Sequence, residues 1–381
     1  MPRILKEMDW ILVIAAVGLS AIGVLLVASL NYTSLAEAWG SPLMRTQLLW
    51  LGLGVVLMFG VALVDYRYLR RVSRVLYVIA LALLVAVFFA GVAAGGATRW
   101  LDLGFLQLQP SEIVKVIIVV TLANQIARRQ GKERPASWGD LVWSGFHVLV
   151  PAVLVLIQPD LGTSLVFAAI LMGELFLTGH NPFQLVLLSV MGLGSAIGLV
   201  VANVSYGVEI FFLKPHMVAR LISFIDPAAD PTGAGYQLQQ SIIAIGSGGF
   251  AGNGLFRGMT AQLSFLPEQH TDFVFSALGH QLGFVGIVLV MSLFLILFMR
   301  MFSIAINTHD VFGLGIVAGV ISLLFFHVIV NAGMSVGIMP VTGLPLPFIS
   351  YGRSAFLAEM VGVGLVLNVA LHKSDIRFGV G

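Results

Sequence analysis

The sequence predicts an all-α polytopic membrane protein with about ten transmembrane helices. Hydrophobic residues make up 59% of the 381 residues, charged residues only 10%, and the mean hydropathy is +1.00. Soluble globular chains are about one quarter charged, so this composition places most of the chain in lipid. The sequence has no cysteine, which excludes disulfides and thiolate metal sites.

Ten apolar segments long enough to cross a bilayer follow one another along the chain, since a span needs about 20 apolar residues. We expect them near residues 10–30, 46–64, 75–94, 110–127, 139–157, 162–179, 183–204, 273–299, 311–331 and 353–371. An even number of spans places both termini on one side. The first span follows a charged segment that lacks a small-residue cleavage site, so we interpret it as a retained helix and not as a signal peptide.

The positive charges predict which side is cytoplasmic. The two densest Lys/Arg clusters, at residues 67–74 and 128–134, fall on the same side as the termini. The positive-inside rule therefore predicts cytoplasmic termini, and we interpret both clusters as topology signals only. A large loop between the seventh and eighth helices, residues 205–272, then lies outside, together with shorter loops near residues 95–109, 158–161 and 332–352.

Three ionisable residues lie at the end of this large loop, in the stretch Phe-Leu-Pro-Glu-Gln-His-Thr-Asp-Phe (265–273). Glu268, His270 and Asp272 directly precede an apolar span. Ionisable groups at the mouth of a membrane helix cost free energy and commonly mark function. The alternative is that Asp272 only interacts with the positive end of the helix dipole.

Two further outer segments carry candidate site residues. Glu112 and Lys115 are three residues apart and share a helix face, either as a structural ion pair or as a cationic ligand held by a carboxylate in an outer cavity. Arg99 lies beside Trp100, which favours a ligand-facing pair, whereas Trp100 alone would be an interfacial anchor. Asp160 is predicted to cap the sixth helix.

The outer loops also contain ordered segments. Residues 236–245 have helical spacing of Leu238, Ile242 and Ile245, with Gln237 and Ser241 on other faces, which predicts an amphipathic helix on the outer leaflet. The Gly-Ser-Gly-Gly segment after it follows no strand, so we reject nucleotide binding. Prolines and glycines in residues 339–352 exclude a helix, and irregular backbone at membrane depth is tolerated where it lines a cavity.

The motifs together resemble the SEDS family (shape, elongation, division and sporulation), over nearly the whole chain and in order. They are Gln-Pro-Ser-Glu (109–112), Gln-Pro-Asp-Leu-Gly-Thr (158–163), the run 235–249, Leu-Pro-Glu-Gln-His-Thr-Asp-Phe (266–273) and Pro-Leu-Pro-Phe-Ile-Ser-Tyr-Gly (345–352). Within the family the chain is most similar to the elongation branch, RodA, through residues 100–104 and 260–265. It departs from the usual pattern at Arg353, where glycine is common, and at His280 and Gln281, where acidic residues are common.

The resemblance implies a single membrane domain over residues 1–381 and a peptidoglycan glycosyltransferase. Such an enzyme polymerises lipid II on the outer face of the bacterial cytoplasmic (inner) membrane, adding disaccharide–pentapeptide units to a glycan held on undecaprenyl pyrophosphate. It also implies a class B penicillin-binding protein as partner, no nucleic acid, and Asp272 as the catalytic carboxylate.

The chemistry of that reaction fits these residues. A sugar hydroxyl becomes a good nucleophile when a carboxylate removes its proton, and the leaving pyrophosphate needs cationic groups or a metal ion. Asp272 is the predicted general base, which we expect to stay ionised at neutral pH, and a divalent cation, Mg²⁺ or Mn²⁺, is a candidate helper. The residues expected to line the substrate site are Lys115, Glu112, Arg99, Trp100, Arg220, Gln237, Ser241, Glu268 and His270. Two alternatives remain: a lipid II flippase, and a non-catalytic scaffold that activates the penicillin-binding protein.

Overall fold

The computed structural model describes residues 7–94, 97–102, 104, 107–129, 137–208, 210, 214–256 and 268–372. Within these ranges nine helices are long and apolar enough to cross a membrane: α2 (Trp10–Asn31), α4 (Pro42–Leu63), α5 (Arg67–Ala90), α6 (Pro110–Arg129), α7 (Trp138–Ile157), α9 (Pro182–Tyr206), α13 (Val274–Ile306), α14 (Val311–Ser335) and α15 (Arg353–His372). The predicted sixth span is the shorter apolar helix α8 (Leu161–Leu177). The all-α polytopic fold is confirmed.

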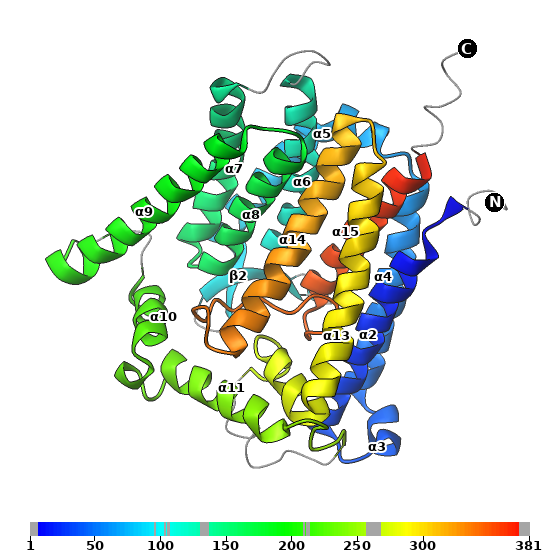
Figure 1. The fold of residues 1–381 in the computed structure, drawn as a ribbon, viewed down its shortest axis with the longest axis vertical. Coiled ribbons are helices and arrows are strands. Elements are labelled where there is room, and N and C mark those ends of the chain that lie inside the picture. The colour runs from blue at the N-terminus through cyan, green and yellow to red at the C-terminus, as the bar shows by residue number, and fades with distance from the viewer. Residues whose placement is uncertain are drawn as a thin grey trace.

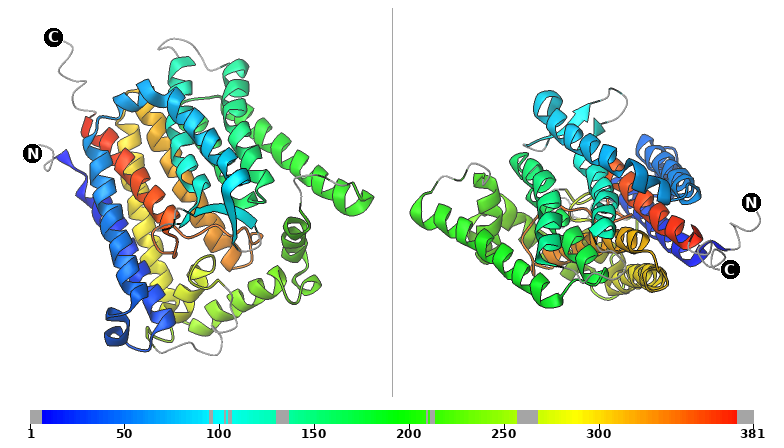
Figure 2. Two further views of the ribbon diagram at one scale, coloured as in Figure 1. Left: turned by 180° about the vertical axis from the view of Figure 1, so that it is seen from behind. Right: turned by 90° about the horizontal axis from the view of Figure 1, so that it is seen from above.

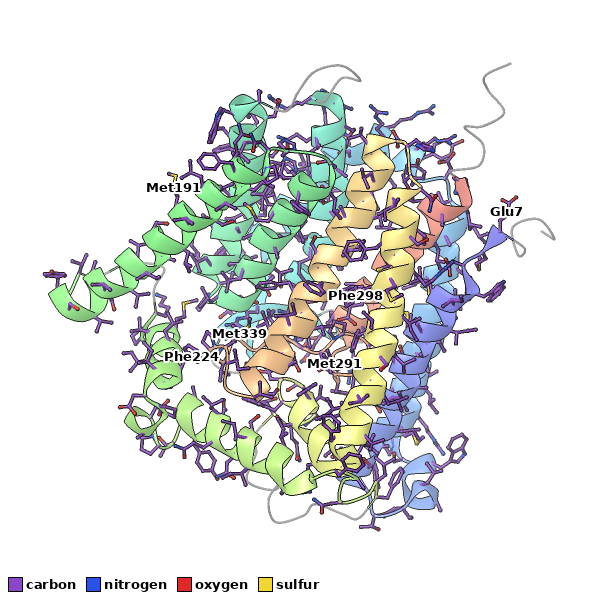
Figure 3. The ribbon with its side chains drawn as sticks, viewed as in Figure 1. Glu7, Met191, Phe224, Met291, Phe298 and Met339 are labelled. Atoms are coloured by element: carbon purple, nitrogen blue, oxygen red, sulfur yellow. The ribbon has the colours of Figure 1, made fainter. Side chains whose placement is uncertain are left out.

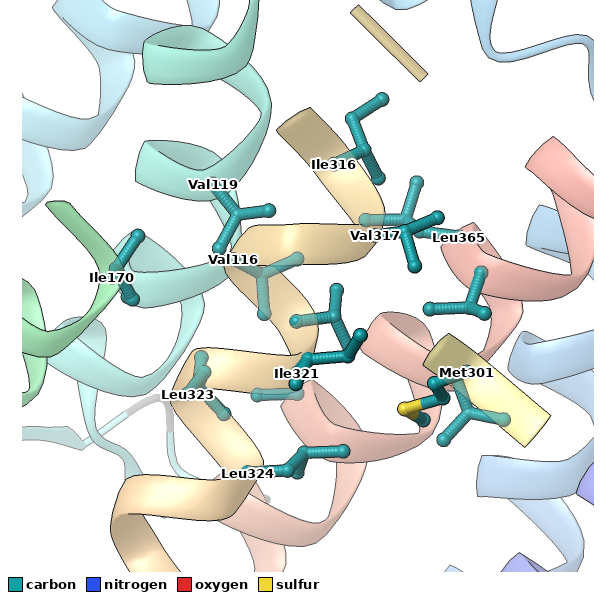
Figure 4. Packing of buried hydrophobic residues seen from close by; sticks show 14 of the residues in the cluster. Val116, Val119, Ile170, Met301, Ile316, Val317, Ile321, Leu323, Leu324 and Leu365 are labelled. Carbon is teal, nitrogen blue, oxygen red and sulfur yellow. The ribbon is translucent and has the colours of Figure 1, made fainter. Parts of the chain in front are cut away.

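Helix α14 lies at the centre of the bundle, between α6, α8, α13 and α15 (Figure 1). In the membrane-spanning window of α14, 72% of residues are buried, compared with 83% in α15 and 6% in α9. Helices α14 and α15 therefore form much of the core, and α14 contacts four other helices of the bundle. Figure 4 shows its Ile321 and Leu324 among Val119 of α6, Leu365 of α15 and Met301 of α13.

Helix α9 is the exception to this packing. It leans away from the bundle in all the views of Figures 1 and 2, and Met191 on it is 63% exposed and lies far from the core (Figure 3). Nearly all of its apolar side chains are exposed on every face of the helix, as expected for a helix surrounded by lipid.

Helix α2 begins and α15 ends at the same end of the bundle (Figure 1), as an even number of spans requires. Polar residues define the helix starts there. Asp9 caps α2, with Leu12 N donating to its Oδ1 at 3.1 Å, and also binds Arg300 of α13 with Nη2–Oδ2 at 2.6 Å. Asp310 caps α14 through Gly313 N at 3.0 Å.

The first Lys/Arg cluster at this end, residues 67–74, lies in a helix and not in the predicted loop. Residues 67–74 are the first two turns of α5 and not a loop, because Asp65 and Tyr66 already provide the turn after α4. The cluster at 128–134 begins at the end of α6, and its residues 130–134 lie outside the described ranges, as do residues 1–6 and 373–381.

A small antiparallel sheet replaces the loop expected at residues 95–109. Its strands are β1 (Gly91–Ala94), β2 (Ala97–Asp102) and β3 (Gln107–Leu108), in the order β1-β2-β3, with Val92 opposite Trp100 and Leu101 opposite Leu108. The prediction of a loop was wrong because only short stretches of alternating residues mark these strands. The sheet places Arg99 at the start of α8, as described below.

The large loop is largely helical. It contains α10 (Pro215–Ile225), the 3₁₀ turn η1 (Pro227–Ala229) and α11 (Ala234–Gly248), which lies across one end of the bundle (Figure 1). A five-residue helix, α3 (Leu35–Trp39), lies at the same end. The predicted amphipathic segment is confirmed as helix, and the Gly-Ser-Gly-Gly segment continues it as far as Gly248. The stretch 257–267, which includes residues 260–265 and the first part of the 265–273 motif, lies outside the described ranges.

Helix α13 is broken at Gly283, which has φ of 64°. The segment 249–254 pairs with the backbone groups that the break leaves without helical partners. Phe284 N donates to Gly249 O at 3.0 Å, and Gly254 N donates to Gln281 O at 2.9 Å. A Cβ at Gly283 would lie 2.7 Å from Phe250 O, so the close approach needs glycine. The freed backbone groups of a membrane helix are thus satisfied by a second segment of the protein.

Candidate functional site

Asp272 lies in a tight turn directly before α13. The turn closes on Glu268 O, which accepts hydrogen bonds from Thr271 N and Phe273 N, each at 3.2 Å. Glu268 has a φ of 52°, a left-handed backbone conformation that residues other than glycine rarely adopt. This turn fixes the backbone of Asp272 directly before α13 begins at Val274.

The turn is fixed to the irregular loop between α14 and α15, residues 336–352, which we call the 336–352 loop. Tyr351 N donates to His270 O at 2.8 Å, and Ser350 Oγ donates to Thr271 O at 2.6 Å. Asn331 of α14 donates through Nδ2 to both Asp272 O and Leu344 O, each at 2.7 Å. The proline-rich loop was predicted to be non-helical, and it is; its backbone groups are used to hold the Asp272 turn.

The carboxylate of Asp272 is left open by this arrangement. A Cβ at Gly343 would lie 3.2 Å from Asp272 Oδ2 and 3.7 Å from Arg220 Nη1, so glycine leaves room between the two charged groups. No ion pair within 4.0 Å joins these two described residues. Among the described residues, no donor forms a hydrogen bond with the Asp272 side chain, which is partly exposed.

The pKa of Asp272 is raised from its ordinary value of 3.8 to about 6. Burial among protein atoms is the main cause, and the charge of Glu268 adds to it, while Arg220 and Arg99 oppose the shift. At pH 7 the group is still ionised in most molecules, as predicted, but it is a stronger base than the ordinary carboxylate that we expected beside cations and a helix dipole. A raised pKa with a free carboxylate is the state that general-base chemistry requires.

Two arginines face Asp272 from segments distant in the sequence. Arg99 on β2 donates to the carbonyl oxygens of Gln158 and Pro159 and lies 3.8 Å from Asp160 Oδ2. Asp160 caps α8, as predicted, through Thr163 N at 3.1 Å. Arg220 on α10 is half-buried, and burial lowers its pKa while Asp272 raises it. Asp272, Arg99 and Arg220 are therefore close enough to affect one another electrostatically.

Glu112 and Lys115 do not open into this group. Lys115 Nζ lies 2.8 Å from Glu112 Oε2 and 3.2 Å from His327 Nε2, and both charged side chains are at most 5% exposed. His327 Nδ1 lies 3.2 Å from Pro345 O. The structural ion pair therefore describes the observed arrangement, and the direct contact of Lys115 with substrate that we had also considered does not. The pair is connected to the 336–352 loop through His327, which contacts both Lys115 and Pro345 O.

The other predicted residues are distributed around the turn. His270 packs its ring 5.9 Å from that of Tyr351, and exposed Glu268 accepts a hydrogen bond from Thr271 Oγ1 at 2.8 Å. Trp100 and Gln237 are half-buried at the same end of the bundle. Ser241 is fully buried, with its hydroxyl 2.5 Å from Ser276 Oγ and 2.7 Å from Ser335 O, so it joins α11 to α13 and α14 and is not open to a substrate.

Three polar residues inside the spans were not predicted as site residues. Asn331, His327 and Glu359 are each at most 5% exposed, and all three bind the 336–352 loop. Glu359 of α15 accepts a hydrogen bond from Phe348 N at 2.8 Å. An isolated polar residue within an apolar span was the available signal. Among the described residues, no group of three His, Cys, Asp or Glu side chains could hold a metal ion.

The raised pKa of Asp272 predicts that Asp272→Asn stabilises the protein. Folding raises this pKa, so the ionised carboxylate costs folding free energy. The cost is absent below about pH 4, grows as pH rises to 6 and is complete above pH 6. We expect a gain of roughly 1–3 kcal/mol at pH 8 and none near pH 4, measured as thermal unfolding in detergent. Asp102→Asn, at an exposed carboxylate on β2, is the control. Equal or lower stability of Asp272→Asn at pH 8 would contradict the assignment.

The buried ion pair predicts a different pattern for Lys115. Lys115→Met leaves Glu112 charged and unpaired inside the bundle, so stability should fall by about 3–5 kcal/mol. The double variant Glu112→Gln/Lys115→Met leaves no buried charge and should recover most of the loss. Thermal unfolding of both variants tests this. A fully stable Lys115→Met protein that binds substrate more weakly would return Lys115 to the substrate site.

The chain is similar to known proteins along nearly its whole length. The family described as "Cell cycle protein" (FtsW, RodA and SpoVE) matches residues 9–375. The peptidoglycan glycosyltransferase MrdB of Escherichia coli (strain K12) is 38% identical over 360 residues, which cover 93% of this chain and 94% of MrdB. Stage V sporulation protein E of Bacillus subtilis (strain 168) is 34% identical over 369 residues, which cover 96% and 97%.

Solved structures agree with the sequence comparison. A structure described as the coordination of polymerisation and crosslinking by a peptidoglycan synthase complex matches with a TM-score of 0.79 and 30% identity, covering 98% of this chain and 99% of that one. The rod shape determining protein RodA of Thermus thermophilus matches with a TM-score of 0.69 and 29% identity, covering 96% and 97%. The chain therefore belongs to the FtsW/RodA/SpoVE family.

Proposed function

We propose that this protein is a peptidoglycan glycosyltransferase that polymerises lipid II, with Asp272 as the general base. The observation that carries the proposal is the unpaired, partly exposed carboxylate with a pKa of about 6, facing Arg220 and Arg99. Relatives at 30–38% identity carry the name peptidoglycan glycosyltransferase, and the products and substrates of that activity match this arrangement of one base and two cations.

The reaction assigns a role to each of these groups. Asp272 takes the proton of the acceptor sugar hydroxyl as its oxygen forms a bond to the anomeric carbon of the donor. The bond from that carbon to the lipid diphosphate breaks, and the leaving diphosphate carries away the electron pair. Arg220 and Arg99 stabilise its developing negative charge, and a diphosphate needs no protonation to leave. A single carboxylate suffices, unlike the carboxylate pair of a glycoside hydrolase.

The surrounding residues take secondary roles in the proposal. Trp100, Gln237, Glu268 and His270 border the substrate, while Glu112 and Lys115 hold the 336–352 loop. A divalent cation, Mg²⁺ or Mn²⁺, fits as a further partner of the diphosphate, since Mg²⁺ typically takes one or two carboxylates together with phosphate oxygens. Exposed Glu268, whose charge acts on Asp272, would supply one such oxygen, whereas the Asp160 carboxylate is already bound by Thr163 and lies beside Arg99. The ion would neutralise diphosphate charge.

We place the protein in the bacterial cytoplasmic (inner) membrane, with Asp272 facing outward. The Lys/Arg-rich end of the bundle would be cytoplasmic, and the large loop 205–272 extracytoplasmic. A class B penicillin-binding protein, which crosslinks the glycan, is the proposed partner. The similarity to the peptidoglycan synthase complex supports this choice.

Cysteine labelling tests the orientation, because the chain has no native cysteine. Arg70→Cys lies at the exposed start of α5, and Gly246→Cys lies on α11, where a side chain meets no atom within 4 Å. A membrane-impermeant maleimide added to intact cells or spheroplasts should label Gly246→Cys and label Arg70→Cys only after lysis. The reverse pattern would contradict the orientation.

The catalytic proposal predicts that Asp272→Ala abolishes glycan polymerisation, with a loss of about 10²–10⁴-fold or more. The variant should fold and bind its partner normally, since the Asp272 side chain makes no hydrogen bond in the described structure. Glu268→Ala and His270→Ala are matched controls in the same turn and should keep part of the activity. Glycan chain length is measured from labelled lipid II with equal amounts of inserted protein and partner. Near-normal chains from Asp272→Ala would favour a flippase or a scaffold instead.

A further inference from the structure

A cavity lined mainly by polar residues lies at the opposite end of the bundle from Asp272. It has a volume of about 380 Å³ and lies between the start of α5, the end of α6 and α7. Its lining includes Arg74, Arg128, Arg129, Thr121, Asn124 and His147. This volume is within the range of small-ligand sites, and none of the reaction steps above uses it.

The inner wall of the cavity is an organised polar surface. The rings of Tyr77 and His147 stack with centroids 4.0 Å apart, and Tyr77 OH donates to His147 O at 2.8 Å. Thr121 Oγ1 lies 3.0 Å from His147 Nε2. Thr121 is 2% exposed and Asn124 is 3% exposed. Polar groups placed this deeply in a membrane protein are costly unless they have a partner or a ligand.

The mouth of the cavity carries excess positive charge. Arg129 lies 3.4 Å from Asp140 and over the ring of Trp143, so its charge is largely matched. Arg128 Nε donates to Asn124 Oδ1 at 3.2 Å, a neutral acceptor. No carboxylate of the described residues lies within 4.0 Å of Arg74 or Arg128. Neither guanidinium group therefore has a carboxylate partner among the described residues, and planar guanidinium matches phosphate oxygens well.

The outer flank is apolar. Val75 is 59% and Val78 is 65% exposed on α5, and Val78 also lines the cavity. An occupant would therefore meet arginines, a polar wall and a lipid-facing surface together. The positive-inside rule explains why arginines gather at this end, but it does not explain a cavity with a hydrogen-bonded polar wall beside them.

We propose that this cavity binds the phosphate-bearing headgroup of an anionic phospholipid. Arg74 and Arg128 hold the phosphodiester, the polar wall accepts a hydroxylated headgroup such as glycerol, and an acyl chain follows the exposed side of α5. Basic pockets between membrane helices at the cytoplasmic face bind anionic headgroups in this way. The proposal gives a binding role to two arginines that the sequence analysis interprets as topology signals only.

Lipid titration of the purified full-length protein in detergent, followed by native mass spectrometry, tests the proposal. The probes are dioleoyl phosphatidylglycerol, dioleoyl phosphatidylcholine and soluble glycerol 1-phosphate. We expect phosphatidylglycerol to bind more tightly than phosphatidylcholine, and Arg74→Gln/Arg128→Gln to weaken it at least about tenfold. Arg71→Gln removes the same charge from α5 but does not line the cavity, and it should change binding less than about twofold.

Several outcomes would overturn the proposal. They are unchanged phosphatidylglycerol binding in the double variant, equal binding of both lipids, and displacement of the lipid by equimolar glycerol 1-phosphate, which would assign the site to a soluble phosphate. Exposed Arg74 is also replaced alone, because it forms no hydrogen bond or ion pair with a described residue, so this variant keeps the test valid if the double variant is unstable. Lipid binding is measured without lipid II, so this result is independent of the polymerisation assay.

Discussion

The two hydrogen bonds donated by the Asn331 amide fix the Asp272 turn against the 336–352 loop. One side chain, buried at the end of α14, holds the backbone of Asp272 and the backbone of Leu344 together. The Asp272 turn and the 336–352 loop contain little regular structure of their own, so their relative position depends on such contacts. Ser350, His327 and Glu359 act on the same loop from other sides. Each bond is worth about 1 kcal/mol alone, but losing Asn331 would leave buried carbonyl groups unsatisfied, which costs more.

A membrane bundle can keep such polar residues only where their charges are matched or where a ligand provides the match. Lys115 and Glu112 match each other within the core, and Arg99 is matched by Asp160 and two carbonyl groups. Asp272 is different because neighbouring cations lie near it without pairing with it. Burial and the charge of Glu268 raise its pKa, and the two arginines only partly offset this shift; proteins retain such a cost where function needs it.

The sequence predicts the parts of this structure that depend on local patterns. Span length and hydropathy predicted the helices, and the spacing of Glu112 and Lys115 predicted their contact. Local pattern could not predict that the pair is buried, because burial depends on α14 supplying His327 from 212 residues away. Arg99 and Asp160 meet for a similar reason, through folding of β2 against the start of α8. The β-sheet was missed because its strands have at most six residues. Ser241 was misjudged because a polar position on an amphipathic helix can face another helix as well as a ligand.

The break in α13 at Gly283 has a consequence for hydrophobic matching. From Gly283 to Ile306 the helix is about 35 Å long, slightly more than the hydrocarbon thickness of about 30 Å. Helix α14 provides an independent measure, since Val311 to Asn331 also spans about 30 Å. Because Asn331 binds the backbone oxygen of Asp272, the α14 distance places Asp272 about one hydrocarbon thickness from Val311, at the level where acyl chains end and phosphate groups begin. A polyprenyl donor whose tail stays in the bilayer carries its diphosphate at this same depth. The bilayer itself would therefore fix one of the three coordinates of the reacting bond, which leaves the protein to set only the two within the membrane plane.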